Sequence, residues 1–338
     1  MDINISGSLT QVLLIEDNSQ IGHARRTSQR LAEQHGFDAT DAGRVALVVT
    51  ELATNVLNHA GRGELHLRVL LRPGGFGIEI LAVDRAQGFD LQACLTDGFS
   101  TGGTQGIGLG AVARQTEVFD MYADIRGAVL LARLYPRVDR QPDLRYGVSQ
   151  HSLHNDPACG DTWHLAYNGA NVSALVIDGL GHGEEAERAA KAGERAFAQT
   201  PFASPVLLME DMHREMIGTR GGAAAFAQFN AARDALTFTG VGNIGASLIA
   251  AAKSRGLASH PGIVGSQYRK AQPFDYANVN GHLLIMYSDG LQSRWNLQDY
   301  PGLVHSHPAV IAAVLHRDFC RLRDDVTLLV VALEAANG

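Results

Sequence analysis

The hydrophobic and polar positions of the chain follow two spacings that alternate along its length. Apolar residues recur every three to four positions from Asp41 to Asn58, which predicts an amphipathic helix with Asp41 as its cap. The segments 65–71 and 76–83 predict two strands that a glycine-bearing turn joins. A glycine-rich run then leads into a helical segment at 111–119.

The second half of the chain shows the same alternation. Strand-like stretches cover 163–167, 283–287 and 326–331. The alanine-rich stretch from Glu184 to Gln199 predicts a helix whose charged residues form a solvated face. The positions expected to pack inward are Ala186, Ala189, Ala190, Ala196 and Phe197.

The length and composition of the chain allow two hydrophobic cores. The chain has 338 residues, of which 46% are hydrophobic. The stretch 136–145 is polar and flanked by prolines, which is typical of a linker. We therefore expect one domain at 1–135 and a second at 146–338.

Acidic residues stand at the ends of apolar strands in the second domain. Asp178 ends one apolar run, and glycines at 179, 181 and 183 leave room around it. The other carboxylates at strand ends are Asp161, Asp289, Asp324 and Asp325. A single Asp-Gly pair is most often a hairpin turn, but recurrence at four strand ends favours convergence. Carboxylate oxygens are the ligands that hard divalent cations prefer.

Four motifs in this order resemble those of the bacterial metal-dependent serine/threonine phosphatases of type 2C. They are Gly160-Asp161, Asp178 to Gly183, Ser288-Asp289-Gly290 and Arg323-Asp324-Asp325. The chain looks most like the branch related to the sporulation stage II phosphatase, and within it like the small phosphatases of stress-signalling modules, which act on phosphorylated STAS-domain proteins. The resemblance extends over about 145–335, includes the loop 240–244, and implies an α/β/β/α sandwich.

The resemblance also implies ligands. Asp178 would bridge two manganese or magnesium ions, and Gly179 would add its carbonyl oxygen. Asp289 and Asp324 would complete the second ion's site, with the adjacent Asp325 as the alternative to Asp324. Two such ions lower the pKa of a water and screen the phosphate charge, so no nucleophilic side chain is needed.

The remaining residues near these motifs would have supporting roles. Asp161 would lie behind the ligands and orient a water. His182 would lie in the loop near the phosphate, because an all-oxygen site argues against histidine ligation. Cys94, Cys159 and Cys320 have neither zinc-site spacing nor the loop of a cysteine phosphatase, which favours buried thiols.

The first domain carries a second set of polar residues. Glu51 and Asn55 are one helical turn apart, so one face of the predicted helix presents a carboxylate and an amide. Asp84 ends the second strand. Glycines at 102, 103, 106, 108 and 110 would let backbone amides approach phosphates at a helix N-terminus. The loop has no Walker Lys-Ser or Lys-Thr, and no short strand leads directly into it as in a dinucleotide fingerprint.

Together these segments resemble the ATP-binding domain of the anti-sigma-factor serine kinases, within the histidine kinase and gyrase-type ATPases. The resemblance covers about 8–135 and implies a Bergerat-type α/β sandwich that binds ATP with magnesium. Asn55 would hold the magnesium ion, Asp84 would accept from the adenine amino group, and Glu51 would be the base for the incoming serine hydroxyl. The remaining nucleotide contacts would come from Gly88, Gly106, Gly108, Gly110 and Arg114.

Two departures affect the adenine loop. The pattern Asp-x-Gly-x-Gly reads Asp84-Arg85-Ala86-Gln87-Gly88, so its first glycine is lost. Ala128 and Val129 stand where a threonine is expected soon after Gly127. An alternative for the first domain is therefore a nucleotide-sensing or partner-binding module without kinase activity.

Charge and hydropathy restrict the setting of the chain. A net charge of -7 with scattered lysines and arginines offers no basic stripe, which excludes nucleic acid as a partner. The N-terminus lacks the apolar core of a signal peptide, and no apolar run is long enough to cross a membrane. We therefore expect a cytoplasmic α+β protein without membrane contact.

The two resemblances lead to one hypothesis about function. The chain would be a bifunctional signalling enzyme of a partner-switching pathway, whose first domain phosphorylates and whose second dephosphorylates a serine or threonine. The shared substrate would be a STAS-domain protein that antagonises an anti-sigma factor. ATPase domains of this class often pair, so a homodimer is compatible with the sequence. A phosphatase for small phosphate compounds is the plainer alternative.

Overall fold

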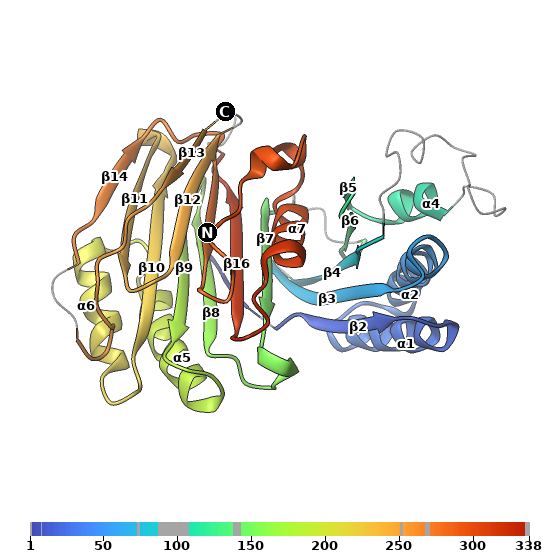
Figure 1. Ribbon diagram of the computed structural model, residues 1–338, viewed down its shortest axis with the longest axis horizontal. Helices are drawn as coiled ribbons and strands as arrows, with labels where there is room; N and C mark the ends of the chain where they lie inside the picture. Colours follow the sequence, from blue (N-terminus) through green and yellow to red (C-terminus); the bar gives the residue numbers. More distant parts are fainter. Residues whose placement is uncertain are drawn as a thin grey trace. The chain divides into compact units, whose positions relative to one another are not determined.

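The contacts of the chain divide it into two compact units (Figure 1). The computed structural model describes residues 2–7, 9–72, 75–86, 108–137, 143–250, 253–267 and 271–334. Unit 1 comprises Met1–Leu9, Arg145–Asp299 and Asp318–Gly338, and unit 2 comprises Thr10–Leu144 and Tyr300–Arg317. No helix of the described segments is long and apolar enough to cross a membrane.

The units differ from the expected domains in two segments. Strand β1 (Asp2–Ser6) pairs antiparallel with β8 (Asp161–Asn168) and so belongs to unit 1. Residues 300–317, with most of helix α7 (Pro308–Phe319), group with unit 2. Segments that are remote in sequence can pair at a sheet edge. The polar stretch 136–145 therefore could not indicate that β1 belongs to unit 1 and residues 300–317 to unit 2.

Unit 1 is built on two antiparallel sheets. The six-stranded sheet has the order β1-β8-β9-β10-β11-β14, and the five-stranded sheet has the order β13-β12-β15-β16-β7. Helices α5 (Glu184–Gln199) and α6 (Pro205–Met216) pack on the six-stranded sheet. The further strands are β7 (Tyr146–His151), β9 (Asn171–Gly179), β10 (Gly222–Asn230), β11 (Ala235–Val241), β12 (Gly245–Ala250), β13 (Lys253–Gly256), β14 (Phe274–Ala277), β15 (Leu283–Tyr287) and β16 (Val326–Ala332).

Helix α5 has the predicted bounds. Its five expected packing positions are all buried, and Phe197 contacts Phe226 of β10 with ring centroids 6.1 Å apart. Short helical turns lie at η2 (Leu153–Asn155), η3 (Ala231–Arg233), η4 (Leu297–Asp299) and η5 (Leu303–His305).

Unit 2 is one antiparallel sheet whose helices before residue 116 pack on one face, while His316 of α7 contacts His66 on the other. The sheet has the order β2-β3-β4-β6-β5, and its core includes Ile15, Leu52 and Ile80. The strands are β2 (Gln11–Ile15), β3 (Gly63–Arg72), β4 (Gly75–Asp84), β5 (Val118–Asp124) and β6 (Gly127–Leu134). The helices are α1 (Asn18–Gln34), α2 (Ala39–Asn55), η1 (Val56–Ala60) and α4 (Gly108–Gln115). The two predicted strands are confirmed as β3 and β4.

The cap predicted for the α2 helix is wrong by three residues. Asp38 caps it, because its side chain accepts from the amide of Asp41 at 2.7 Å. Asp41 is instead buried inside the helix beside Arg44, with 3.3 Å between carboxylate and guanidinium. The helix then continues as the π-helix η1, which changes the spacing of the polar residues after Asn55.

A buried ion network crosses the sheet of unit 2. Glu79 of β4 is 1% exposed and lies 2.7 Å from both Arg68 of β3 and Arg133 of β6. Burial alone would raise the pKa of Glu79, but the two guanidiniums outweigh it and hold that pKa below its usual value. Arg133 also donates to both oxygens of Asp143 at 3.0 Å, and Asp143 lies 3.1 Å from the His307 ring. The network therefore ties segment 300–317 to the sheet.

Removing this central charge should destabilise unit 2. Glu79→Gln leaves two buried guanidiniums without their shared counter-charge, which should cost about 3–5 kcal/mol. Hydrogen exchange of β3, β4 and β6 would measure the loss for this sheet alone. Because the pKa of Glu79 is lowered in the fold, the contribution is present at neutral pH and disappears as pH falls through that pKa.

The matched control is an exposed glutamate of the same unit. Glu33 of α1 is exposed, and its carboxylate accepts from the side chain of Gln29 at 3.1 Å. Glu33→Gln should change protection by less than about 0.5 kcal/mol. Equal protection in the two variants would contradict a structural role for the network.

Candidate functional site

Acidic side chains from separate strand ends gather in unit 1. Asp161 of β8 stands directly opposite Asp178 of β9 in the register of the sheet. Burial raises the pKa of Asp178 to about 7, and the negative charges of Asp289, Asp324 and Asp325 add to the effect. The fold therefore brings all five predicted carboxylates into one electrostatic cluster.

Asp161 is one of the two carboxylates of the cluster that are almost completely buried. It is 3% exposed, and the hydroxyl of Ser288 donates to it at 2.6 Å. Ser288 also accepts from the amide of Thr327 at 2.9 Å, so the serine links three strands. Burial and then the charge of Asp178 raise the pKa of Asp161. Ser288 had no predicted role, although its place directly before Asp289 was a usable signal.

The two adjacent aspartates 324 and 325 have different surroundings. Asp325 is 3% exposed, and its two oxygens accept from the amides of Leu153 at 2.7 Å and Gly160 at 2.6 Å. Asp324 is only half-buried, and one of its oxygens accepts from the amide of Asp325 at 2.9 Å. Burial raises the pKa of Asp324, while the nearby His182 lowers it. Asp325 is thus an anchor between segments, and Asp324 keeps an oxygen available.

Two further residues contact the carboxylate segments. The side-chain amide of Asn243, in the loop 240–244, donates to Asp289 at 2.8 Å. The guanidinium of Arg220 lies against the loop after Asp178, because a Cβ on Gly181 would come within 3.0 Å of it. Arg220 was not predicted, since a lone arginine between a helix and a strand carries no recognisable spacing.

Close main-chain packing requires glycine at two positions of the cluster. A Cβ on Gly179 would lie 2.3 Å from the carbonyl oxygen of Ala186. A Cβ on Gly290 would lie 2.1 Å from the carbonyl oxygen of Asp325. Neither backbone neighbour can yield to a side chain, so these glycines let the acidic segments approach each other.

The donor set of the cluster suits a hard divalent cation. Within the described ranges, no three acidic, histidine or cysteine side chains are spaced to ligate one ion. The carboxylates instead accept from Ser288, Asn243 and main-chain amides, which hold like charges apart. Oxygen ligands and uncompensated negative charge are what manganese or magnesium requires. The oxygen donors of Asp178, Gly179, Asp289 and Asp324 therefore suit these ions in chemical type, although their spacing in the described residues is not that of a closed metal site.

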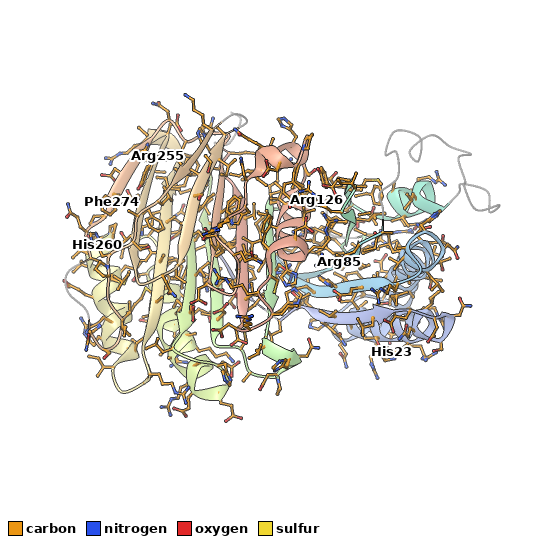
Figure 2. All side chains as sticks on the ribbon, in the orientation of Figure 1. His23, Arg85, Arg126, Arg255, His260 and Phe274 are labelled. Carbon is orange, nitrogen blue, oxygen red and sulfur yellow. The ribbon has the colours of Figure 1, made fainter. Side chains whose placement is uncertain are left out.

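The candidate nucleotide site of unit 2 centres on Asp84. It is 8% exposed, and one oxygen accepts from the amides of Ala86 at 3.0 Å and Ala128 at 3.2 Å. Burial raises the pKa of Asp84 more than these bonds lower it. The amide of Ala128 thus holds the carboxylate although the expected threonine is missing. Arg85 also donates to the main-chain carbonyl of Arg317, near the end of α7 (Figure 2).

The other predicted nucleotide residues are placed only in part. Asn55 is the last residue of α2, and its buried amide nitrogen has no partner among the described residues. Glu51 is half-buried one turn earlier, and Arg114 is exposed on α4. Gly108 and Gly110 lie in the first turn of α4, whereas Gly88 and Gly106 lie outside the described residues. The unpartnered nitrogen is a hydrogen-bond donor that suits a phosphate oxygen, whereas a magnesium ion would take the side-chain oxygen of Asn55.

Comparison with known proteins identifies the family of the first part of the chain. Residues 15–133 match the model of the histidine kinase-like ATPase domain. A relative, the serine/threonine-protein kinase RsbT of Bacillus subtilis (strain 168), is 33% identical over 99 residues, which is 29% of this chain and 74% of RsbT. The chain therefore belongs, through unit 2, to the histidine kinase-like ATPase family, and to its RsbT-like members.

Solved structures resemble this chain in fold. A chain of the bacterial stressosome, described as a modular system adapted to control secondary messenger signaling, is 26% identical with a TM-score of 0.52, covering 56% of this chain and 99% of that one. The PP2C phosphatase domain with a fragment of the regulatory domain of SpoIIE from Bacillus subtilis has a TM-score of 0.50 at 16% identity, covering 95% and 93%. The expected fold class, an ATPase sandwich joined to a type 2C phosphatase sandwich, is confirmed.

The raised pKa of Asp178 predicts how unit 1 responds to pH without divalent cations. Between about pH 4 and pH 7 the folded carboxyl keeps a proton that the unfolded chain releases, so stability should fall as pH rises, by up to about 1.4 kcal/mol per pH unit. Asp178→Asn should remove this part of the slope and stabilise the unit at pH 8. Thermal unfolding followed by tryptophan fluorescence reports on unit 1, which contains Trp163 and Trp295.

Adding manganese tests whether Asp178 binds a divalent cation or only affects the stability of unit 1. It should raise the unfolding temperature of the native chain at pH 8 but not that of Asp178→Asn. Glu210→Gln, at an exposed position of α6, should behave like the native chain in both respects. Parallel pH slopes in the native chain and Asp178→Asn would contradict the cluster.

Proposed function

We propose that the chain is a bifunctional signalling enzyme with a serine/threonine kinase in unit 2 and a metal-dependent serine/threonine phosphatase in unit 1. One observation carries the phosphatase half. Asp161 stands opposite Asp178 in the sheet, and burial together with the charges of Asp289, Asp324 and Asp325 raises the pKa of Asp178 to about 7. Membership of the histidine kinase-like ATPase family and the likeness to RsbT support the kinase half.

The phosphatase roles follow from the surroundings of each side chain. Two manganese or magnesium ions, when bound, supply an acidified water and screen the phosphate charge. Asp178, the Gly179 carbonyl, Asp289 and Asp324 would hold them, with Asp324 preferred to Asp325 because both oxygens of Asp325 are engaged. Asp161, held by Ser288, would orient the attacking water.

Arg220 extends this proposal to the phosphate. Its guanidinium lies against Gly181, in the loop that follows Asp178. A guanidinium binds two phosphate oxygens at once and offsets their charge. Arg220 would therefore bind the phosphoryl group, and exposed His182 would lie near it.

The kinase roles are assigned to α2 and β4. Asn55 would hold the magnesium ion of ATP, and Asp84 would accept from the adenine amino group. Glu51 would take the proton of the attacking serine or threonine hydroxyl. Gly88, Gly106, Gly108, Gly110 and Arg114 would complete the contacts to phosphate.

The substrate proposed for both units is the same STAS-domain protein. A relative of the kinase half is a serine/threonine-protein kinase, and another relative belongs to the stressosome. Joining opposing activities in one chain raises the local concentration of each at a shared substrate. We place the chain in a cytoplasmic partner-switching pathway, as a monomer or a homodimer.

A second function is favoured by the contacts of the adenine loop. Asp84 is nearly buried, and Arg85 beside it donates to the carbonyl of Arg317. These contacts occupy the loop where adenine would bind. Unit 2 would then sense nucleotide or bind a partner without transferring phosphate, and unit 1 would be the only catalyst.

Loss of the carboxylate cluster should abolish phosphatase activity. Asp178→Ala and Asp289→Ala should lower manganese-dependent phosphate release from a phosphorylated STAS-domain protein at least about 100-fold. Arg220→Ala should lower kcat/KM about tenfold through a single charge-assisted contact. Arg233→Ala, at an exposed position in η3, is the matched control and should be unchanged. Full activity of Asp178→Ala would remove the phosphatase proposal.

The kinase activity is tested in a variant without phosphatase activity, so that transferred phosphate is not removed again. In Asp178→Ala, labelled ATP should transfer phosphate to the STAS-domain protein, and adding Glu51→Gln or Asn55→Ala should stop the transfer. Calorimetry with ATP separates the two functions of unit 2. Binding without transfer in the Asp178→Ala background would favour the sensing module, and absence of both would exclude kinase and sensor together.

A further inference from the structure

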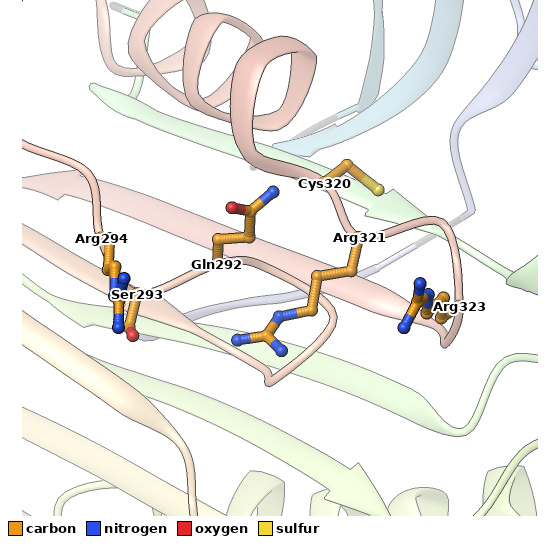
Figure 3. A pocket seen from close by; sticks show the side chains of 6 residues that line it. All are labelled: Gln292, Ser293, Arg294, Cys320, Arg321 and Arg323. Atoms are coloured by element: carbon orange, nitrogen blue, oxygen red, sulfur yellow. The ribbon is translucent and has the colours of Figure 1, made fainter.

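A hollow of about 470 Å³ lies beside the carboxylate segments of unit 1. Two segments line it, as Figure 3 shows. Gln292, Ser293 and Arg294 come from the chain after β15, and Cys320, Arg321 and Arg323 come from the chain before β16. Three of the six lining residues are therefore arginines.

Main-chain hydrogen bonds fix the two walls against each other. The amide of Gln292 donates to Phe319 at 2.9 Å, and the amide of Arg321 donates to Gly290 at 2.9 Å. Leu291 and Cys320 form an isolated antiparallel bridge between these bonds. The two walls adjoin the candidate ligands in sequence. Asp289 lies shortly before the first wall, and Asp324 directly follows the second.

The arginines of the hollow have no acidic partner. Arg294, Arg321 and Arg323 are exposed, and none of their guanidiniums makes an ion pair or hydrogen bond within the described part of the chain. Two exposed arginines on the helices of this unit are paired instead, Arg188 with Glu185 and Arg214 with Asp211, both at 2.9 Å. Three like charges around one hollow, in a chain of net charge -7, create a local positive field that suits an anion.

An exposed hydrophobic residue, Leu322, stands between two of these arginines in the sequence. It is 79% exposed and has a left-handed backbone, with φ of 55°. That conformation is unfavourable for a leucine and holds its side chain out into solvent between Arg321 and Arg323. The rim of the hollow thus combines guanidiniums with one protruding hydrophobic residue.

We propose that this hollow binds acidic side chains next to the phosphorylated residue of the protein substrate. The proposal rests on the phosphatase function proposed for unit 1. Glutamate or aspartate side chains fit a hollow of this volume, and guanidiniums pair with carboxylates through two hydrogen bonds. Because the walls continue directly into Asp289 and Asp324, a bound acidic side chain lies within a few residues of the phosphate. The hollow would select acidic phosphoproteins over small phosphate compounds.

The test compares two phosphothreonine peptides that differ only in their flanking residues. One carries glutamate and aspartate around the phosphothreonine, and the other carries glutamine and asparagine. With manganese, the native chain should show a kcat/KM about tenfold higher for the acidic peptide, chiefly through a lower KM. Arg321→Glu and Arg294→Glu should abolish the preference, while hydrolysis of p-nitrophenyl phosphate stays unchanged because it does not reach the hollow.

The control variant places the same charge change outside the hollow. Arg233→Glu, on η3 of the same unit, should keep the full preference for the acidic peptide. Higher salt should reduce the preference of the native chain, since exposed guanidiniums act through screened charge. A preference that survives Arg321→Glu and Arg294→Glu together would overturn the proposal.

The outcomes separate this inference from the phosphatase function. Equal kcat/KM for both peptides, with p-nitrophenyl phosphate still hydrolysed, would overturn the hollow and leave the phosphatase intact. If no phosphate ester is hydrolysed, the phosphatase function fails, and fluorescence anisotropy of a labelled acidic peptide without phosphate still tests the hollow. Binding to the native chain but not to Arg321→Glu supports it, and equal displacement by a single-stranded RNA of the same charge contradicts a peptide site.

Discussion

The repulsion among the buried carboxylates of unit 1 is the constraint on which the rest of that unit depends. Asp161 and Asp178 face each other across two paired strands, and burial raises the pKa of both. Such a cluster persists only because surrounding groups fix each carboxyl group, through Ser288, Asn243 and main-chain amides. The raised pKa values show that this concentrated negative charge costs stability in the fold.

Unit 2 solves a related problem with opposite charges. Glu79 is as deeply buried as Asp161, but Arg68 and Arg133 compensate it and lower its pKa. Arg133 then extends the network to Asp143, whose other contacts include His307. A compensated network of this kind stabilises the fold, whereas the clustered carboxylates of unit 1 have no such arginine partners among the described residues and their pKa values rise. The buried acidic groups of the two units therefore have pKa values shifted in opposite directions.

Local patterns predicted the elements of the chain well. The bounds of α5, the strands β3 and β4 and the convergence of strand-end aspartates followed from spacing and turn residues alone. The cap of α2 was misplaced, because Asp38 and Asp41 are equally good caps and only the backbone decides between them. The domain bounds missed the exchange of β1 and of segment 300–317, since no local pattern signals a pairing partner that lies more than 150 residues away.

The sequence by itself determined which residue types stand at the strand ends and where glycines allow close approach. It also determined family membership, because the motifs of the ATPase domain are local in sequence. Only the tertiary structure decided which of Asp324 and Asp325 keeps a free oxygen, that Ser288 holds Asp161, and that Arg294, Arg321 and Arg323 share one hollow. The physical reason is that hydrogen bonds and electrostatic interactions depend on the distances between atoms. Those distances are set when remote segments pair in the fold, and the composition of the chain does not determine them.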